Sequence, residues 1–166
     1  MGKGFVEIYC GGGRGKTTLA LGQSLRASLQ GKSVIIIQFL KGNARRELDF
    51  LQDLQDLDIK IFRFERSGMC YADLSDQEKE EQKSNILNGI NFARKVITTQ
   101  ECDFLVLDEI LGLLEYDIVS TEQVVGLLQA RDDMDIILTG NILTEELRRY
   151  ADSVTTIETT DNSIRE

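Results

Sequence analysis

Four glycines within five residues separate a short apolar run from an amphipathic stretch near the beginning of the chain. Residues 11–18 read Gly-Gly-Gly-Arg-Gly-Lys-Thr-Thr, between an expected strand at 5–9 and an expected helix at 16–29. Glycine lets the backbone approach a ligand closely, and the N–H groups of such a turn, together with a helix N-terminus, attract anions. Lys16 adds a positive charge and Thr17 a hydroxyl ligand for Mg²⁺. The pattern predicts a P-loop that binds the triphosphate of ATP.

The spacing of this loop departs from the common pattern, because Cys10 stands where the first glycine of a longer loop would fall. A glycine-rich turn followed by a chance Lys-Thr pair is the alternative interpretation. The order strand, loop, helix favours the P-loop. The residues that we expect around ATP are Gly11, Gly12, Gly13, Arg14, Gly15, Lys16, Thr17 and Thr18.

Apolar runs and amphipathic stretches alternate along the rest of the chain. Ser75 and Glu78 have the spacing of a capping box, which predicts the start of a helix that runs to about Thr98. The alternation predicts an α/β fold of the P-loop NTPase (RecA-like) class, a mostly parallel sheet flanked by helices on both faces. We expect residues 1–166 to form a single nucleotide-binding domain. The expected strands are 33–39, 59–64, 103–107, 135–139 and 154–157, and the expected helices are 43–54, 75–98, 121–130 and 144–150, with a loop at 67–71.

The composition excludes several kinds of chemistry. The chain has no histidine, which removes histidine acid–base catalysis, Ser-His-Asp triads and histidine metal sites. Its three cysteines form no Cys-x-x-Cys pair, and its net charge of −9 argues against a nucleic-acid surface. No apolar run approaches the roughly 20 residues of a membrane span, and the N-terminus lacks a signal peptide. A cytoplasmic location with no nucleic-acid or membrane partner is therefore expected.

Two acidic residues follow the apolar run at 103–107. Asp108 and Glu109 would stand at the carboxyl end of a buried strand, where ligands bind in parallel sheets. Next to a P-loop, such a residue is the expected second anchor of a metal ion. The sequence predicts that Thr17, Asp108 and Glu109 hold Mg²⁺ or Mn²⁺. The alternative for the acidic pair is a solvated strand end.

Several motifs together resemble the corrinoid adenosyltransferases of the BtuR/CobA type. The loop is similar to that family's Gly-Asn-Gly-Lys-Gly-Lys-Thr-Thr, and residues 38–42 are similar to its Gln-Phe-x-Lys-Gly element. Residues 106–110 resemble its Leu-Asp-Glu strand end, followed by Tyr116 at a similar distance. The last two similar blocks are residues 137–140 and 151–155, so that the resemblance covers about residues 4 to 157.

The resemblance implies an activity and a set of substrates. In that family, Co(I) of cob(I)alamin attacks the 5′ carbon of ATP and the whole triphosphate leaves. Lys16, Thr17 and Glu109 would then be catalytic, and Arg26 would lie near the nucleotide; an arginine on the helix surface is the alternative for Arg26. A homodimer and an electron-donating flavoprotein are the partners that the resemblance suggests. The corrinoid would be contacted by Lys41, Gly68, Met69 and Tyr71.

The chain also departs from the family pattern at the corrinoid end. Met69 and Tyr71 stand in the place of the family's Phe and Trp, and Asn141 stands in the place of an arginine. Ordinary loop packing is the alternative role for Met69 and Tyr71. These departures motivate one further hypothesis, a nucleotide or corrinoid binder that has lost turnover. Another P-loop enzyme, either an ATPase or a small-molecule kinase, is a second alternative.

Overall fold

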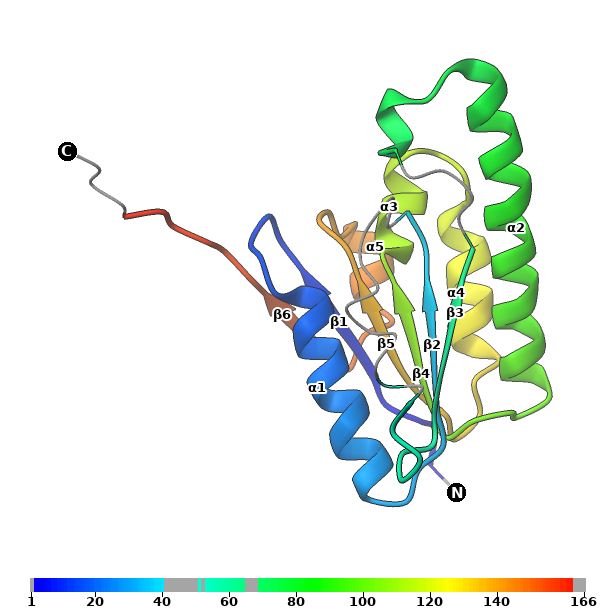
Figure 1. Ribbon diagram of the computed structural model, residues 1–166, viewed down its shortest axis with the longest axis vertical. Coiled ribbons are helices and arrows are strands. Elements are labelled where there is room, and N and C mark those ends of the chain that lie inside the picture. The colour runs from blue at the N-terminus through cyan, green and yellow to red at the C-terminus, as the bar shows by residue number, and fades with distance from the viewer. Residues whose placement is uncertain (1, 41–50, 52, 65–68, 163–166) are drawn as a thin grey trace.

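A parallel sheet forms the centre of the molecule, and its strand order decides which loops meet. The computed structural model describes residues 2–40, 51, 53–64 and 69–162. In these residues six strands lie in the order β3-β2-β4-β5-β1-β6, and all their pairings are parallel (Figure 1). The loops that follow the strands therefore gather at one edge of the sheet. The strands are β1 (Val6–Cys10), β2 (Val34–Gln38), β3 (Ile59–Arg63), β4 (Phe104–Asp108), β5 (Asp135–Thr139) and β6 (Ser153–Thr156).

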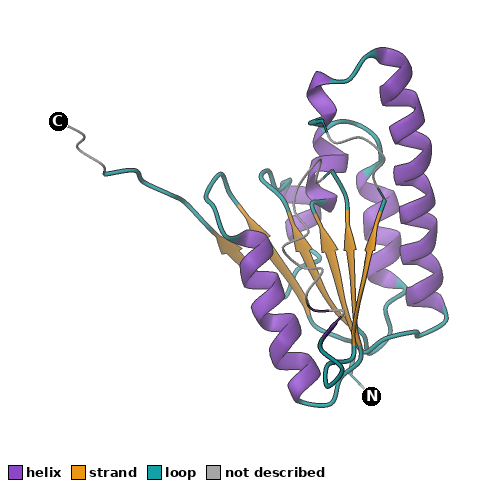
Figure 2. Ribbon diagram, viewed as in Figure 1, coloured by secondary structure: helices purple, strands orange, loops and turns teal. Residues whose placement is uncertain are grey.

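Helices cover both faces of this sheet (Figures 1 and 2). Helix α1 (Lys16–Leu29) packs on one face, where Val34 and Ile36 of β2 are buried. Helices α2 (Asp76–Thr98), α3 (Ile110–Glu115) and α4 (Thr121–Gln129) pack on the other face, where Ile35 and Ile37 are buried. Strand β2 is thus buried on both sides, which is why its sequence is a continuous β-branched run. The predicted parallel sheet with helices on both faces is confirmed.

The predicted elements agree closely with the observed ones. Each predicted strand matches an observed strand to within one residue at either end, and the helix at 16–29 has the predicted bounds. Ser75 caps α2 in the predicted capping box, in which its hydroxyl accepts from the Glu78 N–H and the Glu78 carboxylate accepts from the Ser75 N–H. Helices α4 and α5 (Glu145–Arg148) also stand where they were expected. The helix expected at 43–54 lies almost entirely outside the described residues.

Two short elements were missed. Helix α3 has the sequence Ile-Leu-Gly-Leu-Leu-Glu, a nearly continuous apolar run that contains a glycine and has no helical period. Its N-cap residue, Glu109, makes no side-chain cap, and its first four residues are all buried. Burial against the sheet, rather than a local signal, makes this segment helical. The 3-10 helix η2 (Tyr71–Asp73) begins at the end of the segment that was expected to be a loop.

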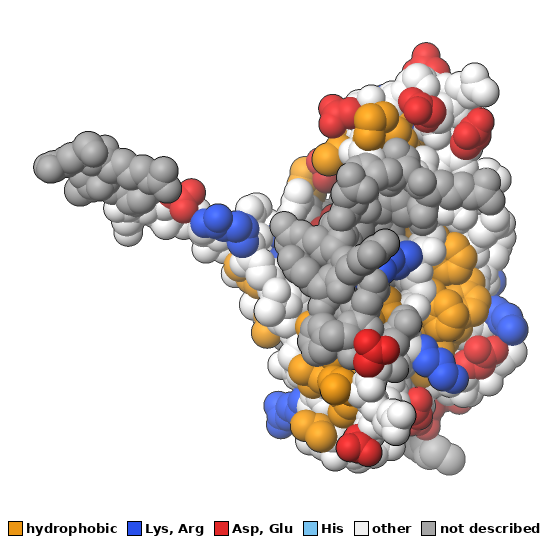
Figure 3. Space-filling view, in the orientation of Figure 1, with side chains coloured by type: hydrophobic (Ala, Val, Ile, Leu, Met, Phe, Trp, Pro, Cys, Tyr) orange, Lys and Arg blue, Asp and Glu red, His pale blue; other side chains and the backbone are white. Residues whose placement is uncertain are grey.

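Acidic side chains are found at the start of α2. Asp76 and Glu78 stand in the first turn of α2, where negative charge interacts favourably with the helix dipole. Figure 3 shows acidic side chains gathered around this end of the molecule.

The helices of the described residues include none with the length and hydropathy needed to cross a membrane.

Gly140, the residue after β5, allows α3 to approach the sheet. A Cβ at this position would collide with the side chain of Leu111 on α3, and the backbone has φ of 156°. We expect Gly140→Ala to lower the free energy of unfolding by about 2–3 kcal/mol, because a packed core resists added volume. Gly126→Ala on α4 is the control, since a Cβ there would have no neighbour within 4 Å. It should raise stability by about 0.5–1 kcal/mol, and equal urea midpoints for the two variants would contradict this account.

Candidate nucleotide-binding site

The glycine loop, residues Gly11–Gly15, joins β1 to α1 in a conformation that leaves the start of the helix open. Gly11 and Gly15 have φ of 103° and 104°, the left-handed region that glycine adopts without strain. Gly15 is the N-cap of α1, and no side chain caps this helix. By contrast, hydroxyl groups of Ser75, Ser120 and Thr144 cap α2, α4 and α5. The first N–H groups of α1, which no helix can satisfy internally, thus face the loop without a side-chain cap and favour an anion.

Lys16 places its ammonium group inside this loop. Its Nζ donates to the carbonyl oxygens of Gly11 and Gly13, both at 2.7 Å, and the residue is only 8% exposed. These bonds hold a positive charge at the concave side of the loop, beside the start of α1. A lysine ammonium binds phosphate as a point charge, so the loop, the helix terminus and Lys16 together favour a polyanionic ligand.

A fully buried carboxylate links the loop to the neighbouring strand ends. The hydroxyl of Thr17 donates to the two carboxylate oxygens of Asp108 at 3.0 and 3.2 Å. The hydroxyl of Thr139 donates to Oδ1 of Asp108 at 2.6 Å, and Nε2 of Gln38 donates to Oδ2 at 3.1 Å. Asp108 is therefore fixed by the ends of β2 and β5 as well as by α1.

Gln38 and Thr139 fall in blocks of the sequence that resemble the family, but no role at the site was predicted for them. Gln38 uses both ends of its amide, because Nε of Arg63 donates to its Oε1 at 2.9 Å while its Nε2 binds Asp108. Thr139 also uses both functions of its hydroxyl, since it accepts from the N–H of Glu109 at 2.9 Å. The signal that could have found them is their position as the last residues of two buried strands.

Glu109 has a strained backbone next to this network. Its φ of 67° lies in the left-handed region, which residues with a Cβ rarely adopt, and it is the N-cap of α3. Strain of this kind costs on the order of 1–3 kcal/mol and is concentrated at functional sites.

The oxygen groups of the site suit a magnesium ion that arrives with a nucleotide. Mg²⁺ is usually held by one or two carboxylates or hydroxyls together with phosphate oxygens and water. Thr17 and Asp108 supply such oxygens within hydrogen-bond distance of one another, and Glu109 follows directly. Groups of three or more His, Cys, Asp or Glu residues that could hold a metal by themselves are absent from the described part of the chain.

The other residues predicted around ATP lie at different distances from the glycine loop. Gly12 in the loop and Thr18 in the first turn of α1 are both exposed. Arg14 turns outward, and its Nη2 pairs with Oδ1 of Asp161 at 3.1 Å, although both side chains are more than three quarters exposed. Arg26 is exposed in the last turn of α1, ten residues after Lys16 and thus about 15 Å farther along the helix. The structure does not bring Arg26 to the loop; its charge stands at the negative end of the α1 dipole.

Two of the residues predicted to contact the corrinoid, Met69 and Tyr71, lie among the described residues, and Tyr71 lies close to the end of α3. The rings of Tyr71 and Tyr116 lie 5.0 Å apart between centroids, with Tyr116 at the end of α3. Met69 and Tyr116 are 47% and 43% exposed, so an apolar surface faces solvent here. Burial, together with the nearby Glu80 and Tyr116, raises the pKa of Tyr71 above its ordinary value. Lys41 and Gly68 lie outside the described residues.

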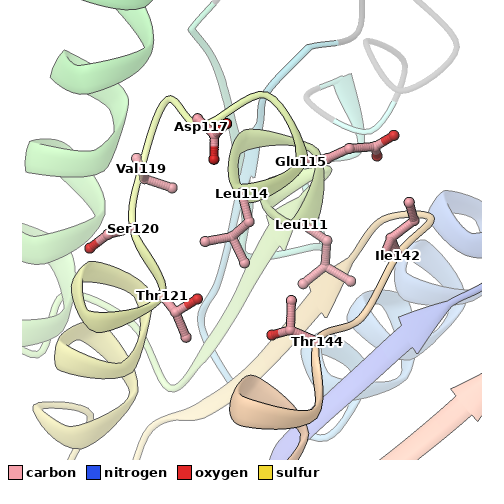
Figure 4. Close-up of a pocket in the computed structure, with 9 residues that line it drawn as sticks. All are labelled: Leu111, Leu114, Glu115, Asp117, Val119, Ser120, Thr121, Ile142 and Thr144. Carbon is pink, nitrogen blue, oxygen red and sulfur yellow. The ribbon is translucent and has the colours of Figure 1, made fainter.

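A pocket of about 390 Å³ opens beside the site, between α3 and the segments that lead into α4 and α5 (Figure 4). Leu111 and Leu114 of α3 point into it, and Ile142 and Thr144 close the side toward β5. The backbone connects it to the loop, because the carbonyl of Asn141 accepts the N–H of Gly11 at 2.8 Å. Among the residues that the structure describes, those predicted at ATP or at the corrinoid do not line this pocket.

Comparison with known proteins identifies the relatives of the chain. The model of the family described as ATP:corrinoid adenosyltransferase BtuR/CobO/CobP matches residues 2–166. Corrinoid adenosyltransferases of Escherichia coli and Salmonella typhimurium are each 28% identical to it, over 92% of this chain and 75% of their own length. The corrinoid adenosyltransferase of Pseudomonas aeruginosa is 24% identical, over 92% of this chain and 74% of its own length.

The fold has a solved counterpart. The crystal structure of a KaiC-like protein from Pyrococcus horikoshii superposes with a TM-score of 0.61 and 19% identity, over 98% of this chain and 74% of that one. This likeness concerns the fold alone. Together with the strand order and the loop after β1, it confirms the predicted RecA-like P-loop class.

Proposed function

Because this chain belongs to the family of ATP:corrinoid adenosyltransferases (BtuR/CobO/CobP), we propose that it transfers the 5′-deoxyadenosyl group of ATP to cob(I)alamin or a related reduced corrinoid. In this reaction an electron pair of Co(I) forms a bond to C5′ of ATP. The C5′–O bond breaks, its electron pair leaves with triphosphate, and cobalt is formally oxidised to Co(III). The observation that carries the proposal is the family match along residues 2–166. It is supported by a loop that holds the Lys16 ammonium group beside the N-terminus of α1, which has no side-chain cap.

The glycine loop acts on the leaving group. Breaking the C5′–O bond adds negative charge to the triphosphate, and fixed positive groups aimed at that charge lower the barrier. Lys16 and the open N-terminus of α1 are such groups, and the bonds from Nζ to the carbonyls of Gly11 and Gly13 orient the ammonium group before the substrate arrives. The loop also fixes C5′ relative to the second substrate, which contributes through proximity.

Mg²⁺ bound to the triphosphate would neutralise further charge on the leaving group. Thr17 and Asp108 are the residues that would hold it, and Glu109 is the next residue in the chain. Asp108 itself is fixed by Thr139 and Gln38, so its carboxylate needs little rearrangement on binding. The reaction needs no protein base, because Co(I) is itself the nucleophile, and this agrees with a chain that has no histidine.

The corrinoid docks at the apolar surface of Met69, Tyr71 and Tyr116. Two of these side chains are nearly half exposed, and the Tyr71–Tyr116 ring pair presents a rigid apolar surface to a flat macrocycle. A tyrosine phenol is uncharged at neutral pH, and the raised pKa of Tyr71 extends this uncharged state to higher pH, so the contact is with an uncharged ring. An apolar face here suits the exclusion of water from the lower side of cobalt.

Tyr71 gives the sharpest test of this surface. We expect Tyr71→Ala to raise KM for cob(I)alamin about tenfold, the usual cost of losing one aromatic anchor, and to leave KM for ATP unchanged. Tyr71→Phe keeps the ring and, because the phenol is neutral, removes no charge; it should behave like the wild type. Equal rises in both Michaelis constants for Tyr71→Ala would argue against a corrinoid surface at this position.

The activity itself is tested in an anaerobic assay with ATP, Mg²⁺ and chemically reduced cob(I)alamin. The expected result is a light-sensitive cobalt–carbon product, followed by its visible spectrum, and one triphosphate for each adenosyl group transferred. Release of ADP and phosphate instead would identify a P-loop ATPase. Binding of ATP without any product would identify a binder that has lost turnover.

A further inference from the structure

The segment that follows β6 runs beside the glycine loop. Strand β6 pairs in parallel with β1, and Thr156 stands opposite Cys10. Because the two strands end level with each other, the chain leaving β6 follows the chain leaving β1. The N–H of Ile157 donates to the carbonyl of Cys10 at 2.8 Å and continues the ladder by one residue. We call Ile157–Asp161 the C-terminal strap.

The strap receives hydrogen bonds from the loop itself. The N–H of Gly13 donates to the carbonyl of Ile157 at 2.8 Å, and the N–H of Arg14 donates to Oγ1 of Thr159 at 2.9 Å. The Arg14 side chain reaches Asp161 in the same segment. Loop residues 13 and 14 are therefore held from outside, by a segment more than 140 residues away in the sequence.

The contact between strap and loop is too close for side chains. A Cβ at Gly11 would lie 2.5 Å from the carbonyl oxygen of Ile157, and a Cβ at Gly13 would lie 2.6 Å from the same atom. A Cβ at Gly12 would meet nothing within 4 Å. Two glycines of the loop are thus required by the strap, in addition to whatever a phosphate requires.

These contacts also decide which N–H groups remain for an anion. Those of Gly11, Gly13 and Arg14 donate to Asn141, Ile157 and Thr159, respectively. Helix α1 begins directly after these residues, next to the ammonium group of Lys16. The strap therefore fixes the outer side of the loop.

We propose that the C-terminal strap is a positioning element for the triphosphate site, with Thr159 as its principal side chain. By accepting the Arg14 N–H, Thr159 holds the loop in the conformation that receives triphosphate; it does not touch the substrate. This inference rests on the proposed function, in that the loop binds triphosphate.

Thr159→Val tests the strap, because valine keeps the shape of threonine and removes the acceptor. We expect the affinities for ATP and for inorganic triphosphate, measured by titration calorimetry without corrinoid, to fall by the same factor of about 3 to 10, the equivalent of one hydrogen bond. The thermal unfolding midpoint should stay unchanged, since water can reach the exposed Arg14 N–H. Thr159→Ser, which restores the hydroxyl, should recover the affinity.

Thr160→Val is the matched control, the same change at the next residue of the strap and at an exposed position. It should bind both ligands like the wild type. Equal affinities for the two valine variants would overturn the role of the strap and leave the proposed function intact. So would a loss in Thr159→Val that is explained by a lower unfolding midpoint. A wild-type chain that binds neither ATP nor triphosphate would overturn the proposed function, and the strap with it.

Discussion

Replacing Lys16 by methionine is expected to lower the rate of adenosyl transfer by about 100- to 1,000-fold, the usual effect of removing one preorganised group that stabilises developing charge. Methionine keeps the length of the side chain and removes the ammonium group that donates to the Gly11 and Gly13 carbonyls. The charge is needed most when triphosphate leaves, so kcat should fall together with kcat/KM. Affinity for ATP, measured by calorimetry, should fall as well.

Stability separates this effect from unfolding. The variant loses two hydrogen bonds but also removes a charge from a position that is only 8% exposed. These contributions oppose each other, so the unfolding free energy should change by no more than about 1 kcal/mol. Lys95→Ala removes an exposed lysine that pairs with Glu101 at 3.5 Å, and it should change neither activity nor ATP affinity. A Lys16→Met variant with a transfer rate within threefold of the wild type would remove the loop from the mechanism.

The sequence predicted the sheet well because each strand carries its own signal. Residues 34–38 are buried on both faces and contain no polar residue before Gln38. The start of α2 is likewise predicted by the capping-box residues Ser75 and Glu78. The glycine loop could be recognised for the same reason, since loop, lysine and helix are adjacent in the chain. Local information was sufficient wherever the interacting residues are close in sequence.

The rest of the site depends on contacts between distant segments. Asp108 could be proposed from its place after a strand, but its bonds to Gln38 and Thr139 follow only from β4 lying between β2 and β5. The position of the strap depends on the pairing of β6 with β1, and the sequence after residue 156 contains no motif that predicts it. For Arg26 the sequence left two positions open, near the nucleotide or on the helix surface, and the residue stands in the last turn of α1, away from the glycine loop.

Asp108→Asn is expected to lower adenosyl transfer by about 100-fold or more, and its dependence on Mg²⁺ distinguishes the cause. Without a divalent cation, the variant should bind ATP at least as tightly as the wild type, because a negative charge near the triphosphate has been removed. With Mg²⁺, the wild type should gain affinity and the variant should not, since the carboxylate that would hold the ion is absent. The comparison needs only calorimetry with ATP, with and without Mg²⁺.

The same substitution should also cost stability, because the Asp108 carboxylate accepts from three donors. An asparagine has one acceptor oxygen, so the donors from Thr17, Thr139 and Gln38 cannot all keep the acceptors that they have now. A buried donor that loses its acceptor costs about 1–3 kcal/mol in unfolding free energy. Asp103→Asn, at the other end of β4, is the control: Asp103 is exposed, and bonds from Ser33 lower its pKa. It should leave both ATP affinities unchanged, whereas an Asp108→Asn variant that still gains affinity with Mg²⁺ would place the ion on other residues.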